Sequence, residues 1–432
     1  MPMRWAVLGF CLVAAAAILG GCLRGSGQDG GKIVLRVADW GGASDDDEFN
    51  RVNREVYAKF ERMHPGVKLK IEHIPGSQEY VFKLLAQHVA GTAPDVVFLD
   101  ASSSAAFINN GVVTDLTPLM RADPKFDPDI FFPNVYDIAK RGDKVYALPG
   151  NFTPMVVYYN KRVFREHGVP YPQEGWTWGD FLRTCKALSD PARDRYGFYF
   201  VNWMPGWITW IWQNGGDVLS PDGTRATGYL NGPRSVEAVQ FFTDLVTKYR
   251  VAPTISESAA TGTNLFQSGE AAMEISGHWA IVGYKAGETE KFRFADLGVV
   301  GLPRHRERVT VMYESGPAIT RQCRHPKMAW EFIKYFSGAE VQDKLCGSGL
   351  AIAAVRSVAE ARRDTSSLEP VFLNEIQYAR APWGAKVEGY AYVEDVGRDA
   401  IERIMIGKVP VQKALDDAAR KIDHKLFGLA GR

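Results

Sequence analysis

The sequence predicts an α/β protein built from two domains, on three observations. Strand-like segments alternate with amphipathic helical segments over residues 32–100, which is the pattern of βαβ units. Beyond an apolar stretch at the N-terminus, about 400 residues remain, more than one hydrophobic core usually serves. The pattern of helices and short strands changes after Pro149 and Gly150, where we expect the first crossing between the domains.

The first part of the globular chain predicts a βαβαβ unit. Residues 32–40 and 67–74 alternate as half-buried strands do, and the continuous apolar run in 94–100 is typical of a strand buried on both faces. Helices are expected between them, at 44–66 and 77–91. The first helix carries an apolar stripe with helical spacing, formed by Phe49, Val52, Val56 and Phe60.

Ligands of parallel sheets bind beyond the carboxyl ends of the strands. The residues that follow the first and third strands are therefore candidates: Trp40, Gly41, Gly42, Asp100 and Ser102. Asp100 could instead only cap the next helix. No GxGxxG motif follows the first strand and no Walker motif is present anywhere, so a nucleotide is not favoured. The acidic run at 45–48 suits a helix N-terminus and lacks the pattern of a calcium loop, so we expect no metal site.

Residues 202–217, "NWMPGWITWIWQNGGD", concentrate tryptophans. If Pro205 opens a helix, then Trp203, Trp207 and Trp210 are spaced i, i+4, i+7 and share one face. An indole needs a partner for its N–H, so the cluster fits a cleft wall as well as a core. Taken alone, the segment favours core packing.

Later segments predict further elements of the second domain. Thr177 and Asp180 have the spacing of a helix capping box, and Pro233 is placed to open a long amphipathic helix. Residues 271–284 predict a strand, a turn and the start of a helix, with Trp279 at the exit of the strand. Residues 295–323 predict two further strands.

The N-terminus resembles a bacterial lipoprotein signal peptide. Arg4 precedes a short apolar run, and Leu19-Gly20-Gly21-Cys22 has the form of a lipobox, followed by a flexible stretch. We expect residues 1–21 to be removed, Cys22 to be lipidated and residues 22–31 to form a tether, which holds the body extracytoplasmically at a membrane. The alternatives are an ordinary secretory signal or a short membrane anchor.

Charge and cysteine content exclude several classes of partner. The net charge of +1 and the pI of about 7.6 give no basis for nucleic-acid binding. The cysteines lack zinc-site spacing, and we expect no metal and no cofactor. Cys185 is expected to be a buried thiol, whereas Cys323 and Cys346 flank two predicted helices that could bring them together. The sequence leaves this disulfide open.

Several segments, in this order and spacing, resemble the sugar-binding lipoproteins of bacterial ABC importers, the family that includes maltose-binding protein. They are residues 59–74, 83–100, 109–120, 143–188, 265–281, 301–303 and 315–338. The resemblance implies the two-lobed periplasmic-binding-protein-like fold, with a hinge and an interlobe cleft. It divides the chain into one lobe of residues 32–148 with 305–356 and another of residues 149–304 with 357–432.

The resemblance also implies ligand-facing positions. They are Trp40, Gly41, Gly42, Asp100, Ser102, Asn151, Thr153, Trp203, Trp207, Trp210, Trp279, Glu314, Ser315, Gly316, Trp383 and Tyr390. The chain departs from the family at Ala353, where proline is usual. Because a sugar presents an apolar face and a rim of hydroxyls, indoles and polar acceptors complement it, and the resemblance favours ligand contact for at least one clustered indole.

The expected function is a monomeric, lipid-anchored receptor, without enzymatic activity, that closes on a sugar and delivers it to an ABC permease. One alternative is a lipid-anchored glycoside hydrolase, for which Asp100 and Glu314 would be the carboxylate pair. Another is the same fold binding glycerol phosphate or another polar solute. A phosphate site would need a Lys or Arg pair that the sequence does not assign.

Overall fold

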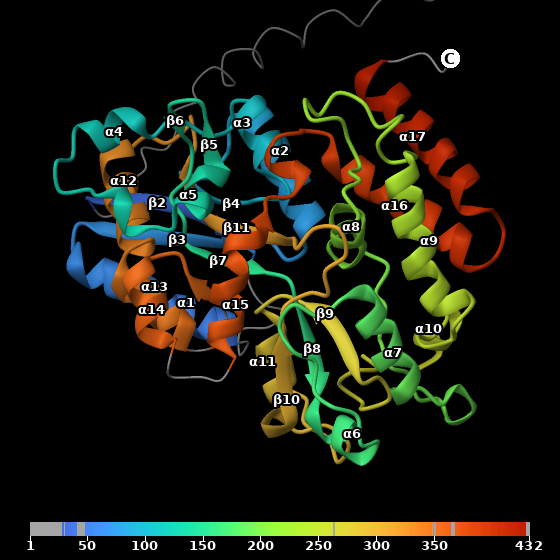
Figure 1. The fold of residues 1–432 in the computed structure, drawn as a ribbon. Helices are drawn as coiled ribbons and strands as arrows, with labels where there is room; N and C mark the ends of the chain where they lie inside the picture. The colour runs from blue at the N-terminus through green and yellow to red at the C-terminus, as the bar shows by residue number, and fades with distance from the viewer. Residues whose placement is uncertain are drawn as a thin grey trace, which may run out of the picture.

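The computed structural model describes residues 28–29, 31–40, 48–261, 264–347, 349, 351–363 and 368–428. Two bodies lie against each other, one around a large mixed sheet and one around a small sheet flanked by long helices (Figure 1). Within these ranges no helix is long and apolar enough to cross a membrane. The predicted α/β class and the division into two bodies are confirmed.

The larger sheet begins with the predicted βαβαβ unit. Strand β2 (Lys32–Asp39) lies between β3 (Val67–His73) and β4 (Val96–Asp100) and is parallel to both. Strand β11 (Thr310–Ile319) then pairs antiparallel with β4 and with β7 (Asn151–Pro154). The remaining strands of this sheet are short: β1 (Gln28–Asp29), β12 (Ile352–Ala353) and β13 (Ala379–Arg380).

Helices cover the larger sheet because their apolar faces pack onto it. Val56 and Phe60 of α1 (Glu48–Met63) are buried, and Phe60 packs edge-on against Phe332 at 5.1 Å between ring centroids. The further elements of this body are α2 (Ser77–Val89), α3 (Ser104–Asn109), α4 (Thr117–Arg121), η1 (Pro128–Ile130), α5 (Pro133–Tyr136), η2 (Asp137–Ala139), the hairpin β5 (Lys140–Arg141) and β6 (Lys144–Val145), α12 (Pro326–Phe336), α13 (Ala339–Gly347), α14 (Arg356–Arg362), α15 (Glu369–Glu375) and η5 (Ile376–Tyr378).

The smaller sheet is antiparallel and has the order β10 (Leu297–Val300), β8 (Val156–Asn160), β9 (Met273–Ser276). Its body contains the largest hydrophobic cluster among the described residues, in which five indoles are buried: Trp176, Trp178, Trp207, Trp210 and Trp212. The helical elements are α6 (Lys161–Glu166), α7 (Trp178–Leu188), η3 (Pro191–Arg193), α8 (Met204–Gln213), α9 (Pro233–Thr247), α10 (Ile255–Thr261), α11 (Ala280–Ala286), η4 (Phe294–Asp296), η6 (Trp383–Ala385), α16 (Tyr390–Met405) and α17 (Val411–Phe427).

Local capping rules explain where two of these helices begin. The Thr177 hydroxyl accepts the backbone N–H of Asp180, whose carboxylate accepts the backbone N–H of Thr177, so the predicted capping box is confirmed. Pro233 stands at the start of α9 as expected.

The chain crosses between the two sheets at short segments. Met155 alone separates β7 in the larger sheet from β8 in the smaller one. Residues 301–309 connect β10 to β11, and Arg308 in this connection forms ion pairs with Glu174 and with the buried Glu375. These crossings bring the end of β4, strand β11 and the start of α8 to one place.

The three cysteines in the described part of the chain are not paired. Cys185, Cys323 and Cys346 are free thiols, so the disulfide left open for Cys323 and Cys346 does not form in this structure. Cys323 packs at the edge of the cluster around α1 and α12, whereas Cys346 on α13 is buried in a different cluster beside Phe152 and Ile352. Burial raises the pKa of both thiols to about 12.

Candidate ligand-binding site

A cavity of about 410 Å³ lies where the end of β4, strand β11 and the beginnings of α8, α11 and α16 meet. Both bodies contribute to it, because β4 and β11 belong to the body of the larger sheet and α8, α11 and α16 to that of the smaller sheet (Figure 1). Its lining residues are Gln78, Asp100, Ser102, Asn202, Trp203, Met204, Pro205, Trp279, Tyr313, Glu394, Asp395 and Arg398.

Three aromatic side chains form walls of this cavity. The rings of Trp203 and Trp279 are 6.1 Å apart at 79°, and those of Trp279 and Tyr313 are 6.2 Å apart at 74°. Trp279 is 40% exposed, which is unusual for so large an apolar side chain. An exposed indole beside two further rings provides an apolar surface that a ligand can cover.

Two glycines leave the space that the indoles of Trp203 and Trp279 occupy. A Cβ atom added to Gly206 would lie 2.8 Å from the Trp203 ring, and one added to Gly277 would lie 2.4 Å from the Trp279 ring. Trp203 itself is the N-cap residue of α8 and has an extended backbone, so its side chain leaves the helix before the first turn. The turn that carries Trp279 is held by His278, whose backbone N–H donates to the Thr153 hydroxyl at 2.8 Å.

Carboxylates complete the lining. Asp100 ends β4, and its Oδ1 accepts the backbone N–H of Ser102 at 2.6 Å as well as the Ser102 hydroxyl. Burial raises the pKa of Asp100 above its ordinary value. Burial, with the nearby charges of Asp100 and Asp395, raises the pKa of Glu394 to about 8. Arg398 donates to Asp395 at 2.9 Å.

Several polar atoms around the cavity have no hydrogen-bond partner among the described residues. They are Oδ1 of Asn202, Nε1 of Trp203 and the hydroxyl of Tyr313. A buried polar group without a partner costs about 1–3 kcal/mol, so such groups are normally satisfied. The cavity thus offers an acceptor, a donor and a hydroxyl to a polar ligand in addition to its aromatic walls.

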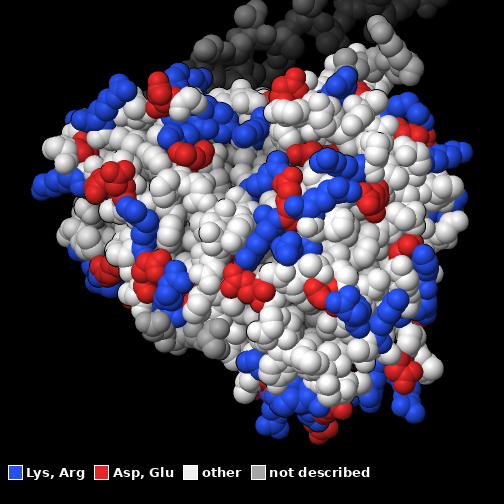
Figure 2. Space-filling view, viewed as in Figure 1, with Lys and Arg blue, Asp and Glu red and all other residues white. Residues whose placement is uncertain are grey.

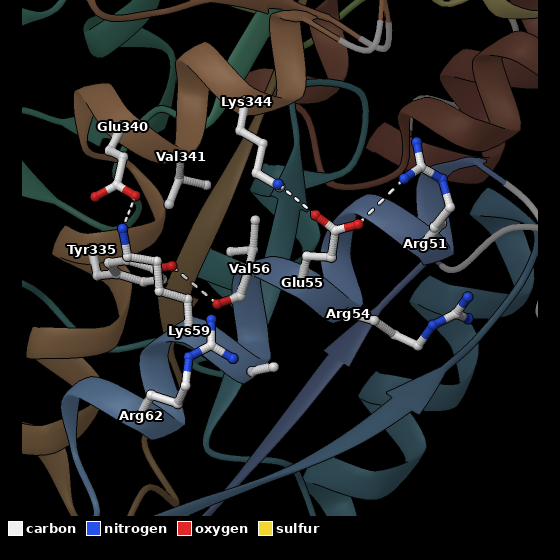
Figure 3. A pocket seen from close by; sticks show the side chains of 11 residues that line it. Arg51, Arg54, Glu55, Val56, Lys59, Arg62, Tyr335, Glu340, Val341 and Lys344 are labelled. Atoms are coloured by element: carbon white, nitrogen blue, oxygen red, sulfur yellow. Dashed lines mark hydrogen bonds and ion pairs between the residues drawn. The ribbon is translucent and has the colours of Figure 1, made fainter.

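Other hollows have a different character. The hollow of about 630 Å³ in Figure 3 lies between α1 and the segment of α12 and α13, and five of its charged side chains form ion pairs with one another. Lys344 and Arg51 both reach Glu55, Lys59 reaches Glu340, and the Tyr335 hydroxyl donates to a backbone carbonyl. These groups already satisfy each other.

The surface carries no block of one charge on the face shown in Figure 2, where basic and acidic side chains are intermingled. Among the described residues no group of three His, Cys, Asp or Glu side chains is arranged to hold a metal ion. The cavity with the aromatic walls is therefore the candidate site.

The sequence matches the profile of the bacterial extracellular solute-binding proteins over residues 43–343, which is more than half of the chain. The chain belongs to this family. Its members are binding proteins of ABC transporters and not enzymes, in agreement with the function expected from the sequence. The predicted two-lobed fold is likewise confirmed by solved sugar-binding proteins of similar structure.

Relatives of the solute-binding protein match it along most of its length. A binding protein of Brucella abortus (strain 2308) is 23% identical over 415 residues, which cover 92% of this chain and 94% of the relative. An ABC substrate-binding protein of Listeria monocytogenes in complex with cycloalternan has a TM-score of 0.81 at 24% identity, covering 92% of this chain and 99% of the other. The sugar-binding protein MalE of Xanthomonas citri has a TM-score of 0.78 at 21% identity, covering 92% and 100%.

The cavity of the binding protein brings together four residues singled out in the sequence. Asp100, Ser102, Trp203 and Trp279 all line it. Gly41 and Gly42 lie outside the described residues, as does Cys22.

Some predicted residues lie next to the cavity and support it. Thr153 is buried and holds the turn before Trp279, as described above. The Ser315 hydroxyl donates to Asn151 Oδ1 at 3.2 Å, which joins β11 to β7. Gly316 packs so tightly that an added Cβ would lie 1.9 Å from the Leu148 carbonyl oxygen.

Glu314 follows Tyr313 on β11 and is 3% exposed. Its Oε1 has no hydrogen-bond partner among the described residues. Burial, and secondarily the charge of Asp100, raises the pKa of Glu314 well above its ordinary value. Glu314 is not among the residues that line the cavity.

Other predicted residues lie in the protein interior, which corrects their expected placement. Trp207 and Trp210 are each 1% exposed and pack in the core, because their helix face is turned toward α9 and α16. Tyr390 is 0% exposed. The half-buried Trp40 packs against Tyr80, with ring centroids 5.0 Å apart and the rings tilted by 34°, and it is not among the cavity-lining residues.

Trp383 is also placed elsewhere. Its indole N–H donates to Asp217 at 2.7 Å, and the same carboxylate oxygen accepts the N–H of Trp212 at 2.9 Å. This arrangement anchors η6 to the helical body, and Trp383 is not among the lining residues.

Most of the missed lining residues are polar. They are Gln78, Asn202, Met204, Pro205, Tyr313, Glu394, Asp395 and Arg398. Tyr313 adjoins the predicted Glu314, and strand alternation could have identified it as the residue facing the other side. Glu394 and Arg398 are four residues apart on α16, so they share a face, but the sequence does not show which face meets the cavity.

Proposed function

We propose that this protein captures a saccharide in the cavity between its two bodies and delivers it to the membrane subunits of an ABC importer. The observation that carries the proposal is the pair of indoles, Trp203 and Trp279, beside polar atoms that lack partners. A sugar ring supplies what they lack, since its C–H face covers an indole and its hydroxyls donate and accept. Relatives with sugar ligands support this ligand class.

Within the cavity we assign the ligand contacts as follows. Trp203 and Trp279 cover apolar ring faces, and Asp100 and Asn202 accept hydroxyl protons. Tyr313 and Ser102 can donate as well as accept. Thr153, Asn151, Ser315, Glu314 and Gly316 support these residues from behind.

Capture requires the two bodies to close on the ligand. The sequence assigned residues 149–304 with 357–432 to the second lobe and 32–148 with 305–356 to the first, but β7 and β13 pair with β11 in the larger sheet. We propose that the body around the larger sheet, β7 and β13 included, moves as one lobe and the body around the smaller sheet as the other, with the chain crossing from β7 to β8. The short crossings at Met155 and at 301–309 support this division, because a few residues at the ends of strands can absorb a hinge motion.

The family is extracellular, and no described helix can span a membrane. We further propose that Cys22 is lipidated after removal of residues 1–21, that residues 22–31 tether a monomeric body to the membrane, and that this anchor keeps the receptor near its permease. Cys22→Ala should abolish acylation, measured as the mass of the mature N-terminal peptide. An unacylated wild-type protein contradicts the anchor.

The other functions are less well supported. The glycoside hydrolase does not suit a family of binding proteins. A phosphate-bearing solute would face Asp100 and Glu394 across a lining whose cation, Arg398, is engaged by Asp395. The negative charge of a carboxylate would repel the negative charge of a phosphate, which disfavours its binding.

A thermal-shift screen of mono- and oligosaccharides tests the proposal. A ligand that binds only the folded protein raises its apparent stability, by about 2.7 kcal/mol at 100 times the dissociation constant. We expect at least one saccharide to raise the Tm of the wild type and to lose most of this effect with Trp279→Ala. The proposal is rejected if no saccharide raises the Tm of the wild type. It is also rejected if chromatography shows that the protein hydrolyses the saccharide during prolonged incubation.

A further inference from the structure

The charges that line the cavity are unbalanced. Three carboxylates, from Asp100, Glu394 and Asp395, face it, together with the guanidinium of Arg398. Arg398 is 2.9 Å from Asp395, which leaves Asp100 and Glu394 without an ion-pair partner in the described part of the chain. Buried carboxylates are normally paired with a cation.

The aromatic walls are not arranged as one flat platform. Trp279 stands at 79° to Trp203 and at 74° to Tyr313, with ring centroids 6.1 and 6.2 Å apart. Rings that meet at steep angles bound a space from several sides. Aromatic side chains around such a space attract a cation through their electron-rich faces, with Trp the strongest of them.

Closure on a ligand makes the imbalance of charge in the cavity more costly. When water leaves the cavity, two unpaired carboxylates become more costly to keep ionised, because desolvation disfavours the charged form. A neutral hydroxyl can donate one hydrogen bond to each carboxylate but leaves the charge in place. A cationic group of the ligand would compensate the charge of Asp100 and would allow Glu394 to ionise beside it.

A metal ion does not meet this need, since no described cluster has the donors to bind one. We propose that the captured saccharide carries a protonated amino group, which lies against Trp279 and between the carboxylates of Asp100 and Glu394. This inference rests on the proposed saccharide-binding function and narrows its ligand to amino sugars or oligosaccharides that contain them.

Glu394 gives the proposal a second readout. Its surroundings are Asp100 from β4, Tyr313 from β11, and Tyr390, Asp395 and Arg398 from α16. Because its pKa is about 8, the carboxyl group is largely protonated at pH 7 before binding. An ammonium group favours the ionised form, so binding should release a proton.

The experiment uses matched pairs of saccharides that differ only at nitrogen. Amino sugars of gluco, galacto and manno configuration, and their short oligomers, are titrated calorimetrically against the full-length wild type alongside the corresponding hydroxyl and N-acetyl compounds. We expect the amine of the best pair to bind at least about tenfold more tightly. At pH 7, titrations in buffers of different ionisation enthalpy should show a net release of protons for the amine alone.

Two variants of α16 make the test specific. Glu394→Gln keeps the shape of the side chain and removes its charge, so the preference for the amine should fall to within about threefold and the proton release should vanish. Glu402→Gln removes an exposed carboxylate of the same helix and should change neither. Binding of the neutral compounds to Glu394→Gln also verifies that this variant is folded.

The outcomes distinguish the proposal of an ammonium-bearing ligand from the proposal of a saccharide receptor. If a neutral member of a pair binds as tightly as its amine, or more tightly, the ammonium proposal is overturned and the saccharide receptor stands. If no member of any pair binds, both fail. An amine preference that Glu394→Gln leaves intact would overturn the assigned position of the ammonium group.

Discussion

Two groups of indoles lie within a short distance of each other and have opposite surroundings. Trp207 and Trp210 are buried on the inner face of α8, and the Trp210 N–H donates to the Gly206 carbonyl at 3.1 Å. Trp203 and Trp279 instead line the cavity, and Trp279 is 40% exposed. The same residue type thus builds the core in one place and the binding surface in the other.

The difference lies in the backbone and not in the residue. Trp203 is the N-cap of α8, with φ −141° and ψ 153°, so it lies outside the helical stripe that its spacing suggested. Trp279 occupies the turn between β9 and α11. Residues before the first helical turn can be directed at a ligand, whereas those within a buried helix are committed to packing.

The largest effect should follow from removing a core indole. Trp210→Ala leaves a cavity beside Trp178 and Phe181, whose rings lie 5.5 and 5.2 Å from that of Trp210. We expect the free energy of unfolding to fall by about 3–5 kcal/mol. Denaturant unfolding measures this loss, and calorimetry on the fraction that remains folded should give a saccharide affinity near that of the wild type. A large affinity loss at unchanged stability would place Trp210 in the binding surface.

The cavity indole should show the opposite pattern. Trp279→Ala should weaken saccharide binding by about 2 kcal/mol, close to 30-fold, because a stacked aromatic contact and its buried area are lost. Its stability should change by less than about 1 kcal/mol, since the side chain is already 40% exposed. Calorimetric titration and thermal unfolding of the same sample test both statements. Wild-type affinity in this variant would remove the indole from the site.

Features that depend on residues close together in the sequence could be predicted. The βαβαβ unit and the Thr177 capping box follow from periodicity and from hydrogen bonds three residues apart, and both are present. The predicted ends of β4 and β9 also identified two residues of the cavity, because Asp100 and Trp279 line it. Local rules place a residue at the end of an element, and the topology then brings these ends together.

Features that depend on distant packing could not be predicted in the same way. Helical spacing shows that Trp207 and Trp210 are near each other but not that α9 and α16 cover them. Glu394 lies almost 300 residues along the chain from Asp100, and only the folded structure brings their charges close enough to affect one pKa. The carboxylates of the cavity are therefore a finding of the structure.

Matched glycine substitutions test the comparison between the core indole of Trp207 and the cavity indole of Trp279. An added Cβ would lie 2.8 Å from the Trp207 ring at Gly397 and 2.4 Å from the Trp279 ring at Gly277. The core indole cannot move, so Gly397→Ala should lower the free energy of unfolding by about 1–2 kcal/mol. The cavity indole can shift into solvent, so Gly277→Ala should mainly weaken binding, by about 1 kcal/mol or fivefold.

Unfolding and titration of both variants check this contrast. Gly283→Ala serves as the control, because Gly283 is an exposed helical glycine whose added Cβ meets nothing within 4 Å. This change should leave stability unaltered or raise it slightly. If Gly277→Ala lost stability and kept its affinity, the two glycines would have the same role.

The smallest expected effect concerns one carboxyl group of each region, the half-buried Glu394 and the buried Glu274. The pKa of Glu394 in the cavity is raised to about 8 and that of Glu274 in the core to about 7, chiefly by burial, from 4.5 in both cases. A folded protein that binds a proton more tightly than the unfolded chain loses stability as the pH rises, here from about 4.5 up to the folded pKa. Each group should therefore destabilise the fold between pH 5 and pH 8.

For Glu394 we expect this loss to be about 1 kcal/mol once solvent screening is allowed for. The gain in stability of Glu394→Gln over the wild type should accordingly be larger at pH 8 than at pH 5, as measured by denaturant unfolding. Glu274→Gln should show the same sign, but its contribution should be complete near pH 7 and indifferent to a saturating saccharide, because its partners are Asn264 and Tyr284 in the core. A ligand that altered the two profiles equally would mean that the cavity carboxylate does not meet it.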